Sequence, residues 1–234
     1  MSVWLEIIIP VRNPGSKLLE SGASLVAQTE RGFGVVISDN FSTSGTEFIA
    51  KFCEQLQAAG IPVHLVKPPR ELGRVQHWNW AHAQAGAEWL KPLFVGDLLK
   101  PAYVETVRRR VEARPDAQIV CCKFESKSAT RTERSFVPFT QDSLTATEFL
   151  DYIIARGNWL GGPVNLAYRR SAYQAVGGYP TQIPAVADYK LHNVRPCVMA
   201  SRSSMTIWRF SNFTTSGFPL ASGAGGSMAV SSCG

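Results

Sequence analysis

The last third of this sequence of 234 residues lacks acidic side chains. Residues 152–234 contain one carboxylate, Asp188, against seven arginines and lysines, whereas residues 1–151 hold 17 basic and 17 acidic side chains. The whole formal charge of +6 therefore lies in the last third, around a single acid. Aspartate is also scarce upstream, where the first two are Asp39 and Asp97. Isolated aspartates combined with a cationic region favour a site for a phosphorylated, metal-bound ligand.

Other absences narrow the class of protein. No apolar run reaches the roughly 18 residues that a membrane-spanning helix needs. The N-terminus lacks the cationic segment and cleavage site of a secretion signal. The five cysteines are odd in number and form neither a CxxC motif nor a zinc-like Cys/His spacing. We therefore expect free thiols and a cytoplasmic protein.

The basic pI of about 9.2 raises nucleic acid as a partner. The cations, however, are not interleaved with stacking aromatics, and no helix-turn-helix or RNA-binding signature occurs. We expect no nucleic-acid partner. A diphosphate or a lipid headgroup as the bound anion explains the positive charge of the last third equally well. Peripheral contact of this part with an anionic membrane face is a further expectation.

Apolar and amphipathic segments alternate along the first half of the chain. The predicted strands are residues 5–10, 34–38, 62–66, 92–95 and 118–124. The predicted helices are residues 16–28, 46–59, 74–87 and 101–113. This alternation is typical of an α/β sheet with parallel strands. Ligands of such sheets bind beyond the carboxyl ends of the strands, where we expect both Asp39 and Asp97.

The second half is less regular. Residues 125–143 are polar and indicate a loop. A helix is predicted at 145–156, a strand at 164–168 and a short helix at 171–176. Residues 216–234 form a Gly/Ser-rich tail. We expect one domain over residues 1–215, with a nucleotide-binding half (1–124) and an acceptor half (125–215).

Six segments in order carry a resemblance. They read IIIPVRN, SDNFSTSGT, LGRVQHWNWAHAQAGAEW, FVGDLLKP, GGPVNLAYRRSAYQAVGGY and VADYKL. Over residues 5–195 the chain resembles the inverting family 2 glycosyltransferases. The resemblance implies the GT-A fold, a Rossmann-like mixed sheet flanked by helices with a smaller acceptor-side part. It also implies transfer of one sugar from a nucleotide-diphosphate sugar to a glycan or lipid-linked acceptor, with inversion, in surface polysaccharide biosynthesis.

The resemblance places the nucleotide at the first two strand exits. Pro10, Arg12 and Asn13 match the segment that borders the base, and Asp39 matches an acid that binds the base or ribose. A carboxylate accepts two hydrogen bonds, which suits these groups. Ser42 adds a hydroxyl to the same loop. The alternatives are an ordinary strand-to-helix turn and an aspartate that only organises its own turn.

Two further positions match residues that handle the diphosphate. Arg74 matches a cation that points toward the nucleotide, although a solvated surface arginine fits equally well. Asp97 matches the last acid of a metal-binding motif, which implies a divalent cation, Mn²⁺ or Mg²⁺, on the diphosphate. Phe94 and Gly96 stand where the family usually has further acids. A single carboxylate provides few ligands for a divalent cation, which prefers several oxygens.

The resemblance assigns the acceptor side to the second half. Asp188 matches the general base that takes the proton of the acceptor hydroxyl, with Ala187 where the family has glutamate. A carboxylate that stabilises a helix N-terminus is the alternative. Trp159, Gly161 and Gly162 match the loop that borders the acceptor sugar, and a buried tryptophan at a turn is the alternative there.

Two other functions stay open. The first is a catalytically weakened GT-A-like domain that binds a nucleotide sugar or glycan without turnover, which the missing acids at positions 94, 96 and 187 favour. The second is a nucleotidyltransferase with a similar core. That activity needs a Gly-rich phosphate loop near the first strand, where this chain has Arg12-Asn13-Pro14-Gly15.

Overall fold

A mixed β-sheet lies at the centre of the computed structural model, which describes residues 3–127, 132–134, 143–157, 162–183, 197–199 and 207–210. Its strands are β1 (Leu5–Val11), β2 (Phe33–Asp39), β3 (Val63–Val66), β4 (Trp89–Pro92), β6 (Ile119–Cys121), β9 (Ser143–Leu144), β10 (Leu166–Arg169) and β11 (Cys197–Met199). They lie in the order β3-β2-β1-β4-β10-β6-β11-β9. The four strands β1 to β4 run parallel, and β10 runs antiparallel to both β4 and β6. The mixed α/β class is confirmed.

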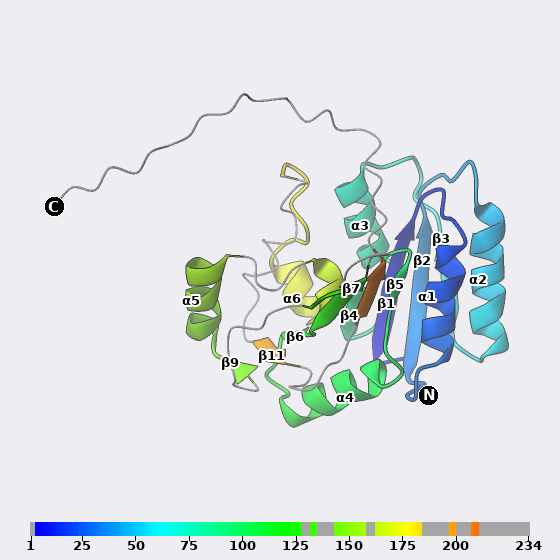
Figure 1. Cartoon of the computed structure of the whole chain (residues 1–234). Coiled ribbons are helices and arrows are strands. Elements are labelled where there is room, and N and C mark those ends of the chain that lie inside the picture. The colour runs from blue at the N-terminus through cyan, green and yellow to red at the C-terminus, as the bar shows by residue number, and fades with distance from the viewer. Residues whose placement is uncertain are drawn as a thin grey trace.

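Helices cover both faces of this sheet (Figure 1). Side chains of α1 (Lys17–Val26), α2 (Thr46–Ala58) and α4 (Tyr103–Ala113) join one hydrophobic cluster. Side chains of α3 (Arg74–Ala83), α5 (Ala146–Arg156) and α6 (Arg170–Ala175) join a second cluster. No described helix is both long and apolar enough to span a bilayer.

Strand β1 shows why the central strands are mostly apolar. Leu5, Ile7 and Ile9 pack into the first cluster, whereas Ile8 packs into the second. Successive side chains of a strand point to opposite faces, so a strand with helices on both faces favours apolar residues at consecutive positions and not only at alternate ones.

The fourth strand differs from the prediction. It occupies Trp89–Pro92 instead of residues 92–95. The prediction misplaced this strand because a lysine inside an apolar run suggests an exposed position, yet Lys91 is fully buried. Its ammonium donates to the Val164 and Leu166 carbonyl oxygens, the latter at 3.3 Å. Burial lowers the pKa of Lys91 to about 8.

A second, smaller sheet was not predicted from the sequence. It joins β5 (Asp97–Leu98), β7 (Phe124–Lys127), β8 (Thr132–Arg134) and β12 (Ile207–Phe210) in the order β5-β12-β7-β8. The predicted strand 118–124 is therefore divided between β6 and β7, and part of the predicted loop 125–143 is strand. The predicted strand 164–168 begins with a 3-10 helix, η1 (Pro163–Asn165).

Candidate active site

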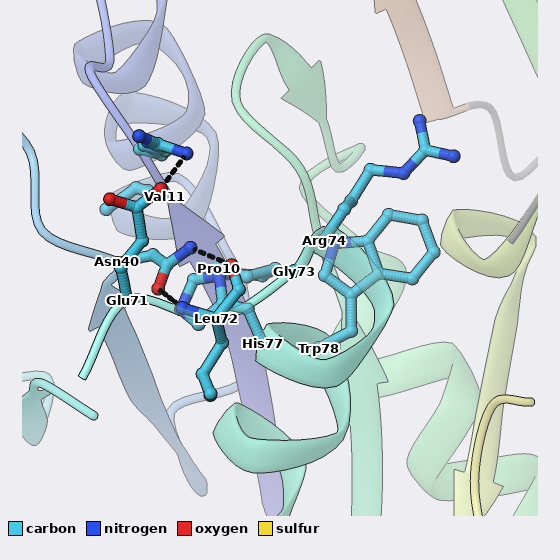
Figure 2. Close-up of a pocket in the computed structure, with 10 residues that line it drawn as sticks. Pro10, Val11, Asn40, Glu71, Leu72, Gly73, Arg74, His77 and Trp78 are labelled. Carbon is cyan, nitrogen blue, oxygen red and sulfur yellow. Dashed lines mark hydrogen bonds and ion pairs between the residues drawn. The ribbon is translucent and has the colours of Figure 1, made fainter. Parts of the chain in front are cut away.

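A pocket of about 530 Å³ opens at the carboxyl ends of β1 and β2, as the α/β pattern predicts (Figure 2). Its walls come from the exit of β1, the residue after β2, the loop before α3 and the first turns of α3. The lining residues are Pro10, Val11, Arg12, Asn40, Glu71, Leu72, Gly73, Arg74, His77 and Trp78. Figure 2 shows Arg74 and Trp78 side by side on one side, with Asn40 and Glu71 on the other.

Asn40 holds the wall that the loop before α3 forms. Its amide nitrogen donates to the Leu72 carbonyl oxygen at 2.8 Å, and its amide oxygen accepts from the Leu72 N–H at 3.0 Å. Its backbone N–H donates to the Val11 carbonyl oxygen at 2.9 Å. Asn40 is only 3% exposed, so these bonds are shielded from water. They fix the loop relative to both strands.

Arg12 and Glu71 form an ion pair at the pocket mouth. Arg12 Nη1 lies 2.6 Å from Glu71 Oε1, and both side chains are about half exposed. An exposed pair of this kind contributes roughly 0–1 kcal/mol to stability. Its main consequence is local, because it places guanidinium donors beside carboxylate acceptors at the edge of the pocket.

The N-terminus of α3 adds positive charge to the opposite side of the pocket. The N-cap is Gly73, whose N–H donates to Gln76 Oε1 at 3.3 Å. The Arg74 guanidinium lies 5.6 Å from the centroid of the Trp78 ring, a cation–π distance. An arginine together with the positive end of a helix dipole favours an anionic group here.

His77 forms part of the pocket wall as a neutral ring. It is 4% exposed, and its Nε2 lies 2.7 Å from Ser38 Oγ. Burial lowers the pKa of His77 to about 4, although the charge of Asp39 and a hydrogen bond with Ser38 oppose the shift. At neutral pH the ring therefore contributes hydrogen bonding and no charge.

The loops that follow β1 and β2 are tied together beside the pocket. Asn13 has a left-handed backbone (φ 48). Its side-chain oxygen accepts from the Thr43 N–H at 2.8 Å, and its N–H donates to Ser42 Oγ at 2.8 Å. Asp39 Oδ1 accepts from the Ser42 N–H at 3.0 Å. Asn13, Asp39 and Ser42 thus shape the pocket edge without being among its lining residues.

Asp97 lies in a different setting from the one predicted. It begins β5 instead of ending a strand, after a turn that runs from Phe94 through Gly96 (φ 88). Its N–H donates to the Phe94 carbonyl oxygen at 2.9 Å, and its Oδ2 accepts from the Phe94 N–H at 3.3 Å. Asp97 is 5% exposed. The described residues contain no cluster of three His, Cys, Asp or Glu side chains suited to a metal.

Helix α3 is fastened to the second half of the chain through Asn79. The Asn79 side chain donates to the Tyr179 carbonyl oxygen at 2.8 Å, and it accepts from the Tyr179 N–H at 2.9 Å and from Tyr173 Oη at 2.6 Å. His82 contacts Tyr168 Oη, which lies 3.1 Å from Tyr179 Oη. The pocket helix is therefore held in place by β10 and by the chain that follows it.

The structure brings together only part of the predicted site. Pro10, Arg12 and Arg74 line one pocket, and the Asn13–Ser42 loop pair borders it, whereas Asp97 is not among its lining residues. Gly162 caps η1, and its carbonyl oxygen accepts from the Asn165 N–H at 3.0 Å. Asp188, Trp159, Gly161 and the tail 216–234 lie outside the described residues. Their roles stay predictions.

Sequence reasoning missed several pocket residues, namely Asn40, Glu71, Leu72, His77 and Trp78. A signal for two of them was present. Glu71 and Leu72 follow the third parallel strand, and strand ends of this kind meet at one edge of the sheet. His77 carried no such signal, since an isolated histidine within a helix is more often a packed residue.

The comparisons with known proteins identify the family. The model of "Glycosyl transferase family 2" matches residues 6–177. A protein of Haemophilus influenzae described as an uncharacterized glycosyltransferase is 23% identical over 185 residues, which is 79% of this chain and 59% of that protein. Glycosyltransferase GlyG of Streptococcus pneumoniae is 22% identical over 51% of this chain and 38% of that protein. The chain thus spans about two fifths to three fifths of these relatives.

Solved structures share the fold. Staphylococcus aureus TarS in complex with UDP-GlcNAc superposes with a TM-score of 0.71 at 17% identity, over 90% of this chain and 58% of that one. Mannosyltransferase PcManGT from Pyrobaculum calidifontis, with GDP-Man and Mn²⁺, gives a TM-score of 0.61 at 18% identity, over 92% and 59%. At these identities the likeness concerns the fold, a mixed α/β sheet of GT-A type. With most of its length matched by the family model, the chain belongs to glycosyl transferase family 2.

Proposed function

We propose that this chain transfers one sugar from a nucleotide-diphosphate sugar to an acceptor hydroxyl, with inversion at the anomeric carbon. One observation carries the proposal: the pocket at the carboxyl ends of β1 and β2 lies within the segment that the family model matches. It combines the strand exit at Pro10 and Val11 with a cationic helix end at Arg74. A nucleoside suits the first feature and a diphosphate suits the second.

The donor is the best-supported ligand class. TarS was solved with UDP-GlcNAc and PcManGT with GDP-Man. In this chain, Pro10, Arg12 and the loop of Asn13 and Ser42 would enclose the nucleoside, with Asp39 at its edge. Arg74 would face the diphosphate. Because these neighbours hold both uridine and guanosine donors, they leave the base of this donor open.

A divalent cation fits the donor side in one way. Mg²⁺ and similar cations bind through one or two carboxylates when substrate phosphates supply further oxygens. Asp97 would supply the single carboxylate, and the diphosphate would supply the other oxygens. Such a cation offsets the charge that develops on the leaving diphosphate. PcManGT was solved with Mn²⁺.

The transfer step needs a base on the acceptor side, and Asp188 is the only carboxylate after residue 151. Its carboxylate takes the proton of the acceptor hydroxyl while that oxygen forms a bond to the anomeric carbon. The bond from this carbon to the diphosphate oxygen breaks on the opposite face, and the nucleoside diphosphate leaves. Displacement from the opposite face inverts the configuration. We propose a growing surface glycan or its lipid carrier as the acceptor, with Trp159, Gly161 and Gly162 beside the acceptor sugar.

Two further features belong to the same proposal. The cationic last third suits a lipid diphosphate or an anionic membrane face, so we propose peripheral membrane contact from the cytoplasmic side. Residues 1–215 form one catalytic domain, with the donor half preceding the acceptor half.

A donor screen tests the proposal. Purified protein is mixed with UDP-, GDP-, dTDP- and CDP-sugars, with and without Mn²⁺, and thermal stabilisation is compared with release of the nucleoside diphosphate. We expect one donor class both to stabilise the protein and to be consumed. Stabilisation without any turnover supports instead the alternative of a binding domain without catalysis.

A further inference from the structure

Glu71 is the one acidic side chain among the described residues that line the pocket. Two neighbouring polar side chains of the pocket already have hydrogen-bond partners within the protein. The Asn40 amide bonds both backbone groups of Leu72, and His77 Nε2 bonds Ser38 Oγ. Arg74 lies on the opposite side, against Trp78 (Figure 2). Arg12 and Glu71 are therefore the charged side chains that line this side of the pocket and are placed to meet the edge of a base.

The Arg12–Glu71 pair presents a definite pattern of donors and acceptors. With the two side chains 2.6 Å apart, guanidinium N–H donors stand directly beside carboxylate oxygens that accept. A matching base edge carries an acceptor next to a donor, with no further acceptor facing the carboxylate.

The common bases differ in how they meet this pattern. Guanine offers its O6 to the guanidinium and its N1–H and exocyclic amine to the carboxylate. Cytosine offers N3 and O2 to the guanidinium and its exocyclic amine to the carboxylate. Adenine likewise offers its N1 to the guanidinium and its exocyclic amine to the carboxylate. Uracil and thymine carry one N–H between two carbonyl groups. Giving that N–H to Glu71 therefore brings a carbonyl oxygen close to the second carboxylate oxygen, and like partial charges repel.

We infer that Glu71, together with Arg12, selects a donor whose base carries an exocyclic amine (guanine, cytosine or adenine) over uracil and thymine. This inference rests on the proposed function, since it takes the pocket to be the nucleoside site. It assigns Glu71 as a residue that determines specificity for the donor. Hydrogen bonds to charged groups discriminate strongly between ligands. Because the Arg12–Glu71 pair is partly exposed, we expect a difference in affinity between the two classes of base of at least about tenfold.

The test is calorimetric titration of the protein with GDP, CDP, ADP, UDP and dTDP, all in the presence of Mg²⁺. We expect GDP, CDP or ADP to bind at least about tenfold more tightly than UDP and dTDP, and the strongest of the three identifies the base. In Glu71→Ala the preference should shrink to within about threefold. The matched control is Glu112→Ala, which removes the exposed partner of Arg108 on α4, outside the pocket. It should keep the preference of the wild type.

Three outcomes overturn the inference, and they differ in what they say of the proposed function. UDP or dTDP binding as tightly as the best of GDP, CDP and ADP refutes the base preference and leaves the donor site intact. A preference that survives in Glu71→Ala removes Glu71 as its source. No binding of any nucleoside diphosphate overturns both the inference and the proposed function. Thermal unfolding of each variant checks that it is folded.

Discussion

Asn40, His77 and Arg12 show that the polar side chains of the pocket are held by neighbours. Asn40 is fixed by Leu72, His77 by Ser38 and Arg12 by Glu71. Side chains that already have fixed orientations lose little conformational entropy when a ligand binds. The pocket is therefore largely preformed, and single substitutions in it should change affinity more than they change the fold.

Asp39 gives the first prediction at this scale. Asp39→Ala removes a carboxylate from the pocket edge and also the acceptor of the Ser42 N–H. We expect the affinity for the donor and for the free nucleotide to fall alike, by roughly 1–3 kcal/mol, measured by calorimetry. Asp116→Ala, which loses an exposed partner of Arg114, serves as the control. Unchanged affinity in Asp39→Ala contradicts a nucleoside role.

Asp97 gives the second prediction. Asp97→Asn keeps the shape of the side chain and an oxygen that can accept from the Phe94 N–H, but it removes the negative charge that a cation needs. We expect the dependence of donor affinity and of turnover on Mn²⁺ concentration to flatten. Full wild-type activity in EDTA argues against a metal role and leaves arginine or lysine to stabilise the leaving diphosphate.

At the scale of elements, helix α3 has one face that lines the pocket and another that holds the helix to the rest of the protein. Arg74, His77 and Trp78 line the pocket, whereas Asn79 fastens the helix to the chain after β10 and His82 fastens it to β10 itself. This fastening depends on a close approach at Gly178. A Cβ there would lie 2.7 Å from Asn79 Oδ1 and 2.8 Å from Tyr173 Oη, and the backbone is left-handed (φ 67).

Gly178→Ala tests that approach. Any non-glycine residue with this backbone costs about 1–2 kcal/mol, and crowding in a packed region adds about 1–3 kcal/mol. Gly60→Ala is the matched control, because Gly60 has φ 73 but open space around its Cβ position. We expect Gly178→Ala to lower the free energy of unfolding in urea more than Gly60→Ala does. Equal losses mean that the contact with Asn79 is unimportant.

The sequence predicts elements well where their pattern is local. Helix α5 was expected from residue 145, and Thr145 indeed caps it, since Thr145 Oγ1 accepts from the Glu148 N–H at 3.3 Å. The strand predicted at 92–95 was misplaced because buried Lys91 resembles a surface residue. The smaller sheet pairs β12 with β5 and β7, which are distant in sequence, so no local pattern indicates it. Glu71 was missed because its place in the pocket also depends on segments distant in sequence, namely the strand ends that meet at one edge of the sheet.

At the scale of the whole molecule, two buried histidines predict how stability depends on pH. Burial lowers the pKa of both His77 and His82 to about 4, from an ordinary value of 6.5. Between these pH values the two histidines bind protons in the unfolded chain but not in the folded chain. Stability should therefore be full above about pH 6.5 and fall as the pH drops toward 4.

Urea unfolding at several pH values measures this dependence. In His77→Gln the slope between pH 4 and 6.5 should shrink by up to about one proton, or 1.4 kcal/mol per pH unit. A slope that is the same in His77→Gln and in the wild type means that His77 is not neutral in the folded protein.

The central claim is that this member of glycosyl transferase family 2 transfers sugar with Asp188 as base. The most direct measurement takes one preparation each of wild type and Asp188→Asn. It records donor affinity by calorimetry and release of the nucleoside diphosphate from that donor. The account predicts nearly equal affinities and a rate that falls by on the order of 10²–10⁴-fold in the variant. A rate within a few-fold of wild type, or a wild type that binds donor and never consumes it, would contradict the account.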